Sequence, residues 1–186
     1  VDLIAVTVGP GLEPALWTGI TFSQELKKEY GKVTVGVNHL EGHLYSFLLP
    51  KKNGRQDLGG RTIFPAIALI VSGGHTILLL VKDFKNWKKL GETRDDAVGE
   101  AFDKVARLLR LPYPGGPALE KLARKGNPRG VEFPRPMIYD KNFDFSFSGL
   151  KTSVLYYLRD NKNYLAADIA ASFQVAAVDV LVKKTL

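Results

Sequence analysis

Two strand–helix pairs in the first fifty residues constrain the fold of this chain more than any other feature. An apolar, strand-like run over residues 2–8 leads through a glycine–proline turn into a helical pattern over residues 12–30. Gly31 is a natural stop for that helix. A second short strand over 32–37 is followed by a helix that begins at His39 and runs toward Leu49. This order predicts an α/β fold.

The pattern changes after residues 51–61, which are polar and rich in glycine. This segment is the best linker candidate in the chain. We therefore predict two domains, one over residues 1–60 and one over residues 61–186.

The second domain opens with two β-rich runs, residues 66–71 and 76–81, joined by Ser72-Gly73-Gly74-His75 as a tight hairpin. Asp95 or Asp96 is a suitable cap for the next helix. Pro117 is expected to open a short helix. Helical patterns are predicted near residues 98–109, 117–122, 150–158 and 166–186.

Composition narrows the partners of the chain. It carries 26 Lys and Arg against 19 Asp and Glu, and the resulting net charge of +7 favours acidic partners, nucleic acid above all. The basic residues are scattered, with no aromatic stripe interleaved as in single-strand binders. The charge therefore permits a nucleic-acid partner without pointing to one.

The chain contains no cysteine, which excludes disulfides and thiolate metal sites and suits a reducing cytoplasm. No apolar run has the length of a membrane-spanning helix. Val1 leads directly into a strand-like run, and no stop signal follows the helical pattern that reaches Leu186. We therefore expect an internal fragment of a cytoplasmic protein.

The segment Asn38-His39-Leu40-Glu41-Gly42-His43 holds two of the three histidines in the chain. If it is helical, His39 and His43 lie one turn apart on the same face, a spacing that suits two imidazoles binding one metal ion. A polar helix start with two unrelated histidines is the alternative, and the pair alone does not decide between them.

The same pair raises the hypothesis of a metalloprotease, which the spacing opposes. In H-E-x-x-H enzymes the general base directly follows the first histidine, but Leu40 holds that position here. Glu41 lies roughly 200° around a helix from each histidine and would point away from the metal.

Two glycine turns and one acid are candidate nucleotide contacts. Adjacent glycines in Ser72-Gly73-Gly74 let backbone N–H groups approach an anion, although a plain hairpin turn is the favoured explanation of the motif taken alone. His75 suits a turn or packing role better than that of a third metal ligand. Pro114-Gly115-Gly116-Pro117 lets backbone approach a ligand ahead of a helix N-terminus. Asp103 can accept ribose hydroxyls or be a solvated surface acid.

The order of these motifs resembles the TsaD family of tRNA threonylcarbamoyladenosine transferases, once described as O-sialoglycoprotein endopeptidases. The matching stretches run almost end to end: residues 7–19, 36–44, 70–76, 95–109, 113–117, 133–136 and 144–152.

The resemblance implies an actin-like ATPase (ASKHA) fold with two ribonuclease-H-like lobes. Residues 1–60 would then hold the end of the first lobe, and residues 61–186 the start of the second. It also implies an acyltransferase that passes a threonylcarbamoyl group from threonylcarbamoyl-adenylate to N6 of adenosine 37 in tRNA and releases AMP. The partners expected from the family are tRNA, that adenylate, a paralogous partner subunit and an accessory ATPase, with no membrane.

Carried over residue by residue, His39 and His43 match the metal-binding pair of the family, which would hold one divalent ion, iron or zinc. The positions that match substrate-binding residues are Ile70, Val71, Ser72, Gly73, Gly74, Asp103 and Gly116. We assign no catalytic residue. The N-terminal phosphate loop of the family, its late Gly-Gly turn and the carboxylate that completes the metal site have no match here. We therefore expect the chain alone to be inactive.

Two further functions stay open. One is a non-catalytic, nucleotide-binding partner subunit of the same pathway, although such partners lack the histidine pair. The other is an actin-like small-molecule kinase, which gives no reason for a paired-histidine metal site. Metal content and dependence on tRNA separate these hypotheses.

Overall fold

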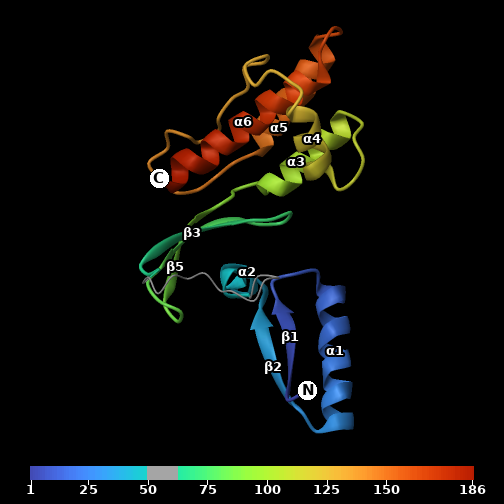
Figure 1. Ribbon diagram of the computed structural model, residues 1–186, viewed down its shortest axis with the longest axis vertical. Coiled ribbons are helices and arrows are strands. Elements are labelled where there is room, and N and C mark those ends of the chain that lie inside the picture. Colours follow the sequence, from blue (N-terminus) through green and yellow to red (C-terminus); the bar gives the residue numbers. More distant parts are fainter. Residues whose placement is uncertain (50–62) are drawn as a thin grey trace. The chain divides into compact units, whose positions relative to one another are not determined.

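The computed structural model describes residues 1–49 and 63–186, which belong to two compact units, Val1–Thr62 and Ile63–Leu186 (Figure 1). Both units mix helices and strands, so the α/β class is confirmed. The predicted linker and the predicted boundary after residue 60 lie outside the described residues. The assignment of the units to two lobes stays a prediction.

The first unit is a strand–helix–strand crossover followed by a short helix. Strands β1 and β2 pair in parallel, and α1 connects them as the sequence predicts. Helix α1 ends at Gly31, whose φ of 63° and N–H bond to the Lys27 carbonyl form a left-handed cap. The elements are β1 (Leu3–Gly9), α1 (Glu13–Tyr30), β2 (Val33–Asn38), α2 (His39–Leu44) and a 3₁₀ turn (Ser46–Leu48).

Helix α2 begins where the sequence predicts but ends sooner. Asn38 caps it, because its Oδ1 accepts bonds from the N–H groups of Leu40 at 2.8 Å and Glu41 at 3.4 Å. The prediction of a helix running toward Leu49 is wrong, since α2 stops at Leu44. The Ser46 hydroxyl donates to the His43 carbonyl at 2.8 Å, a local bond that competes with a continuing helix.

The second unit joins an antiparallel sheet of order β3-β4-β5 to four helices. Strands β3 and β4 have the predicted bounds, and the Ser72 N–H donates to the His75 carbonyl at 2.9 Å to close the predicted hairpin. Strand β5 was not predicted, because half of its residues are charged and most of them are exposed. The elements are β3 (Ala66–Val71), β4 (Thr76–Val81), β5 (Trp87–Glu92), α3 (Val98–Leu108), α4 (Gly115–Ala123), α5 (Ser148–Asp160) and α6 (Ala166–Thr185).

The core of this unit lies among the four helices and one strand. Phe145, Phe147 and Phe173 are its largest fully buried side chains, and Leu78 of β4 joins them. Helix α6 has apolar side chains at three- and four-residue spacing that are buried here, which explains why its sequence gives a strong helical signal. Among the described residues, no helix is both long and apolar enough to cross a membrane.

Two predicted helix starts are wrong in detail. Helix α4 begins at Gly115, after Pro114, so Pro117 is its third residue and not its first. Helix α3 is not capped by Asp95 or Asp96. Its N-cap position is Ala97, and the buried Thr76 hydroxyl accepts the Val98 N–H at 2.9 Å. Strand β4 therefore supplies the cap that the local sequence was expected to provide.

Candidate nucleotide pocket and histidine pair

A cavity of about 540 Å³ in the second unit collects most of the predicted substrate-binding residues, and its volume lies in the usual range for small-molecule sites. The walls come from the β3–β4 turn, the first halves of α3 and α4, and α6. Its lining residues are Val71, Ser72, Gly73, Val98, Gly99, Phe102, Asp103, Pro114, Gly116, Pro117, Glu120, Gln174, Val178 and Leu181.

The structure brings five of the seven predicted positions to this cavity: Val71, Ser72, Gly73, Asp103 and Gly116. Ile70 is buried within β3, and Gly74 lies at the turn beyond the lining residues. A larger hollow of about 1020 Å³ beside the end of α6 contains none of the predicted residues. We therefore take the smaller cavity as the candidate site.

Gly99 lets the β3–β4 turn pack directly on the first turn of α3. A Cβ atom at this position would lie 2.5 Å from the Ser72 carbonyl oxygen and 2.8 Å from the Gly73 Cα. Those distances are shorter than real Cβ contacts, and both neighbours are backbone atoms that cannot swing away. Only glycine therefore fits where the turn meets the helix.

The two glycines at the start of α4 have different roles. A Cβ on Gly115 would lie 2.6 Å from the Ala106 Cβ and 2.8 Å from the Asp103 Cα, so Gly115 serves the packing of α4 against α3. A Cβ on Gly116 would meet no atom within 4 Å. Gly116 therefore keeps open space at the cavity wall, where a ligand can approach the backbone.

Asp103 connects the two helices at the cavity. Its Oδ1 accepts the Gly115 N–H at 2.8 Å, so it caps α4 from the middle of α3. Within the described part of the chain, Oδ2 accepts no such bond and keeps its capacity to accept a ligand hydroxyl. The half-buried carboxylate is thus more than a solvated surface acid.

Both α3 and α4 present their first turns to the cavity. The first four N–H groups of a helix have no partner inside it, and the aligned peptide dipoles add partial positive charge there. Val98 and Gly115 donate their N–H groups to Thr76 and Asp103, which leaves those of Gly99 and Gly116 at the cavity wall. Together with the backbone of the Ser72-Gly73 turn, they make the cavity suited to an anionic ligand such as a phosphate.

Sequence reasoning missed several lining residues, among them Gly99, Phe102, Glu120 and Gln174. Glu120 lies one turn after Gly116, a spacing that could have pointed to it. No sequence signal marks Gln174, which comes from a distant helix. Its Oε1 is buried and, among the described residues, has no hydrogen-bond partner.

The histidine pair of the first unit has the geometry of two ligands of one ion. Helix α2 places His39 Nε2 and His43 Nε2 3.2 Å apart. Two metal–nitrogen bonds of about 2.0–2.1 Å at a tetrahedral angle would put the nitrogens about 3.3 Å apart. A hydrogen bond between the two rings fits the same distance. No group of three metal-ligating side chains occurs among residues 1–49 or 63–186, so further ligands would have to come from elsewhere.

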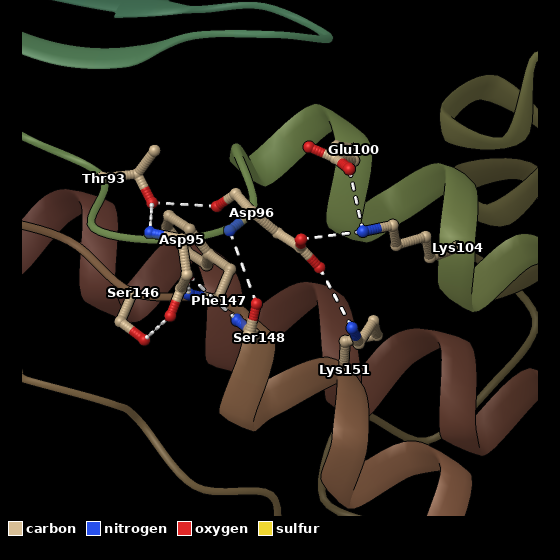
Figure 2. Close-up of polar contacts among 9 residues, drawn as sticks. All are labelled: Thr93, Asp95, Asp96, Glu100, Lys104, Ser146, Phe147, Ser148 and Lys151. Carbon is tan, nitrogen blue, oxygen red and sulfur yellow. Dashed lines mark hydrogen bonds and ion pairs between the residues drawn. The ribbon is translucent and has the colours of Figure 1, made fainter.

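A polar cluster at the start of α3 fixes that helix against α5, as Figure 2 shows. The carboxylate of Asp95 accepts bonds from the N–H groups of Phe147 at 2.8 Å and Ser148 at 3.1 Å, and from the Ser146 hydroxyl at 2.6 Å. Asp95 therefore caps α5 and not α3. The position of the first turn of α3, and hence of the cavity wall, depends on this contact.

Asp96 forms an ion pair with one lysine from each helix (Figure 2). Its Oδ1 lies 2.7 Å from Lys104 Nζ of α3, and its Oδ2 lies 3.2 Å from Lys151 Nζ of α5. The second contact is close enough for an ion pair but lacks good hydrogen-bond geometry. Burial raises the pKa of Asp96, but the hydrogen bond from Lys104 and the positive charges of both lysines outweigh it, so the net pKa is lowered.

Replacing Asp96 with asparagine is expected to lower the free energy of unfolding and to make it depend less on pH in the acid range. Because the pKa is lowered in the folded state, Asp96 stabilises the fold above its unfolded pKa, about 3.9, and this stabilisation is lost as the pH falls through the lower folded value. Urea unfolding at pH 7 should show a loss of about 2 kcal/mol, below the full value for a buried pair because both lysines are partly exposed.

The matched control is Glu92→Gln, which breaks the exposed Lys89–Glu92 pair at 2.6 Å. An exposed pair contributes little, so this variant should unfold like the wild type. Equal stabilities of the two variants at pH 7, or an Asp96→Asn variant that keeps the full acid sensitivity below pH 4, would show that the two-lysine contact does not stabilise the fold.

Known proteins resemble this chain along its whole length. A family profile described as "TsaD: tRNA N6-adenosine threonylcarbamoyltransferase" matches residues 1–186. The tRNA N6-adenosine threonylcarbamoyltransferase of Moorella thermoacetica is 50% identical over 190 residues, which cover 100% of this chain and 53% of that protein. The enzymes of the same description from Kosmotoga olearia and Thermotoga neapolitana are 51% and 48% identical, with 53% and 54% of their lengths covered. The chain thus spans about half the length of the curated relatives it matches.

Proposed function

The chain belongs to the TsaD family of tRNA N6-adenosine threonylcarbamoyltransferases, and we propose that its second unit binds the adenylate part of threonylcarbamoyl-adenylate for transfer to adenosine 37 of tRNA. The observation that carries this proposal is the convergence of Ser72, Gly73, Asp103 and Gly116 on one cavity, although they lie far apart in the sequence. An adenylate presents a phosphate, two ribose hydroxyls and an aromatic base, and the cavity offers a counterpart for each.

The cavity residues act by binding and orienting the leaving group. The N–H groups of Gly73, Gly99 and Gly116 would hold the phosphate. Those of Ser72, Val98 and Gly115 already donate within the protein. Oδ2 of Asp103 would accept a ribose hydroxyl, and the apolar side chains of Phe102, Val178 and Leu181 suit the base.

The reaction itself would be an acyl transfer. The adenosine N6 amine forms a C–N bond to the carbamoyl carbon, the bond from that carbon to the phosphate oxygen breaks, and the amine loses a proton. Negative charge then develops on the departing AMP phosphate. Backbone N–H groups already aimed at that phosphate would stabilise the charge without reorganisation.

The metal of this proposal is a divalent ion held by His39 and His43 of the first unit, with iron and zinc as the candidates. The spacing of the two Nε2 atoms supports this role. When bound, such an ion supplies Lewis acidity toward the carbonyl and phosphate oxygens. The two imidazoles would hold it through Nε2, which requires both rings to be neutral.

The wider setting is also a proposal and rests on family membership. We place the first unit at the end of one lobe and the second at the start of the other lobe of an actin-like ATPase fold. The substrates would be threonylcarbamoyl-adenylate and tRNA, and the partners a paralogous subunit and an accessory ATPase in the cytoplasm.

Incorporation of labelled threonine into tRNA tests the proposal. The complete protein, loaded with metal and supplied with its partners, ATP and bicarbonate, is expected to label tRNA in a manner that depends on this protein. If a folded, metal-loaded protein leaves tRNA unlabelled, the proposal that it is a transferase is overturned. Phosphorylation of a small molecule in the absence of tRNA would favour the kinase hypothesis. Labelling of tRNA by the partners without this protein would favour the hypothesis of a non-catalytic subunit.

A further inference from the structure

The end of the β4–β5 hairpin, residues 82–89, concentrates positive charge on an exposed surface, and we call it the basic hairpin. All eight residues are exposed. Four are lysines and one is an aspartate, which gives +4 − 1 = +3. It joins β4 to β5 at the opposite end of β4 from the Ser72-Gly73 turn (Figure 1).

The basic hairpin also contains two exposed aromatic side chains. Phe84 is 51% exposed and Trp87 is 38% exposed, and both alternate with lysines along the chain. The chain as a whole has no aromatic stripe among its basic residues, but these two rings lie among the lysines of this segment. Lysines that alternate with exposed aromatic rings are typical of surfaces that bind nucleic acid.

The turn of the basic hairpin is well fixed. Oδ1 of Asp83 accepts the N–H groups of Lys85 at 2.8 Å and Asn86 at 2.9 Å, and the Lys82 N–H donates to the Asn86 carbonyl at 2.9 Å. The Phe84 ring contacts Phe64 edge-on, with centroids 4.7 Å apart. A fixed turn loses little conformational entropy when it binds a partner.

Most of the positive charge is available to a partner. Asp83 is engaged by its own turn, and the side-chain hydrogen bond from Asn86 is the largest of the causes that lower its pKa. Lys89 pairs with Glu92 at 2.6 Å. Within the described part of the chain, Lys82, Lys85 and Lys88 have no ion-pair partner.

We propose that the basic hairpin binds the sugar–phosphate backbone of tRNA, with Trp87 stacking on an unpaired base. This inference rests on the proposed function, which makes tRNA the substrate. The six residues of β4 separate the hairpin from the Ser72-Gly73 turn by about 20 Å. It would therefore hold nucleotides away from the reacting adenosine and contribute affinity, not chemistry.

A role in preventing the sheet from pairing with another chain explains only some of the lysines in the basic hairpin. Strand β5 is an edge strand, and lysines on an edge discourage pairing with another chain. That role accounts for Lys88 and Lys89 within the strand. It does not account for Lys82 and Lys85 in the turn, or for an exposed tryptophan beside them.

Salt-dependent binding of tRNA tests the inference. A triple variant, Lys82→Gln, Lys85→Gln and Lys88→Gln, is compared with a control that removes three exposed lysines elsewhere, Lys28→Gln, Lys125→Gln and Lys162→Gln. If each hairpin lysine contacts one phosphate, the slope of log affinity against log salt falls by roughly two to three for the hairpin variant only. An unchanged slope, or equal weakening in both variants, would overturn the inference.

Fluorescence of Trp87 gives a second readout that does not depend on the folding of the triple variant. Residues 1–186 include two tryptophans, so the emission of Trp87 is isolated as the difference between a Trp17→Phe variant and a Trp17→Phe, Trp87→Phe variant. Binding of tRNA is expected to quench it, and Trp87→Phe is expected to keep most of the affinity because phenylalanine also stacks. Saturation with tRNA that leaves the Trp87 emission unchanged would exclude stacking.

Calorimetric titration with AMP separates this inference from the proposed function. A wild type that binds AMP but binds tRNA independently of the hairpin would overturn the inference and leave the adenylate pocket supported. A wild type that binds tRNA through the hairpin but does not bind AMP would support the inference and count against the pocket.

Discussion

Replacing both His39 and His43 with alanine is expected to remove the bound divalent metal and to abolish threonine incorporation into tRNA. The two Nε2 atoms lie 3.2 Å apart, so each supplies one bond to the same ion, and loss of both leaves no imidazole to hold it. Metal content by elemental analysis after gel filtration gives a readout independent of activity. The variant should contain less than about one tenth of the wild-type metal, because a lost ligand at a two-histidine site costs at least ~1.4 kcal/mol.

The third histidine provides the matched control. His75 lies in the β3–β4 turn, where its N–H donates to the Ser72 hydroxyl at 3.1 Å, and its imidazole is not part of the pair. His75→Ala should therefore keep the full metal content. Retention of metal by the double variant, or equal loss in the His75→Ala variant, would mean that the 3.2 Å contact is only a hydrogen bond between two rings.

Replacing Gly99 with alanine is expected to weaken both folding and nucleotide binding. The added Cβ would lie 2.5 Å from the Ser72 carbonyl oxygen, so the turn and the first turn of α3 must move apart. Overpacking of this kind costs roughly 1–3 kcal/mol, which urea unfolding can measure. Because the same two segments line the cavity, we expect the affinity for AMP to fall by at least about tenfold in the molecules that remain folded.

Gly116→Ala is the control, since it adds the same methyl group in the first turn of α4. That methyl would meet no protein atom within 4 Å, so stability should be unchanged or slightly higher. It projects toward open space at the cavity wall, so AMP binding should still fall if the ligand approaches there. A Gly99→Ala variant as stable as Gly116→Ala would show that the turn accommodates the methyl group without strain.

Local patterns in the sequence located most of the elements. Val71 and Thr76, at the ends of β3 and β4, were placed correctly because two short apolar runs flank a glycine turn. Gly31 ended its helix as predicted. Strand β5 was missed because half of its residues are charged and it has no apolar alternation, and such a strand is recognised only by its pairing with β4.

Features that depend on distant contacts could not be read from the sequence. Asp95 looks like the cap of the helix that follows it, but its carboxylate binds Phe147 and Ser148. Gly99 looks like an ordinary helical glycine until the Ser72 carbonyl is placed against it. The family resemblance supplied Asp103 and Gly116 as site residues, and the cavity at which they meet became visible only in three dimensions.

The cap that Asp95 provides has a consequence for the order of folding. Helix α5 cannot satisfy its first N–H groups from its own neighbourhood, because their acceptor lies about fifty residues earlier in the chain. Closing so long a loop is entropically unfavourable, and contacts of this kind slow the folding of small domains. The first turn of α5 should therefore complete late, at the step that joins it to the segment preceding α3, whereas the β3–β4 hairpin can form early from contacts among near neighbours.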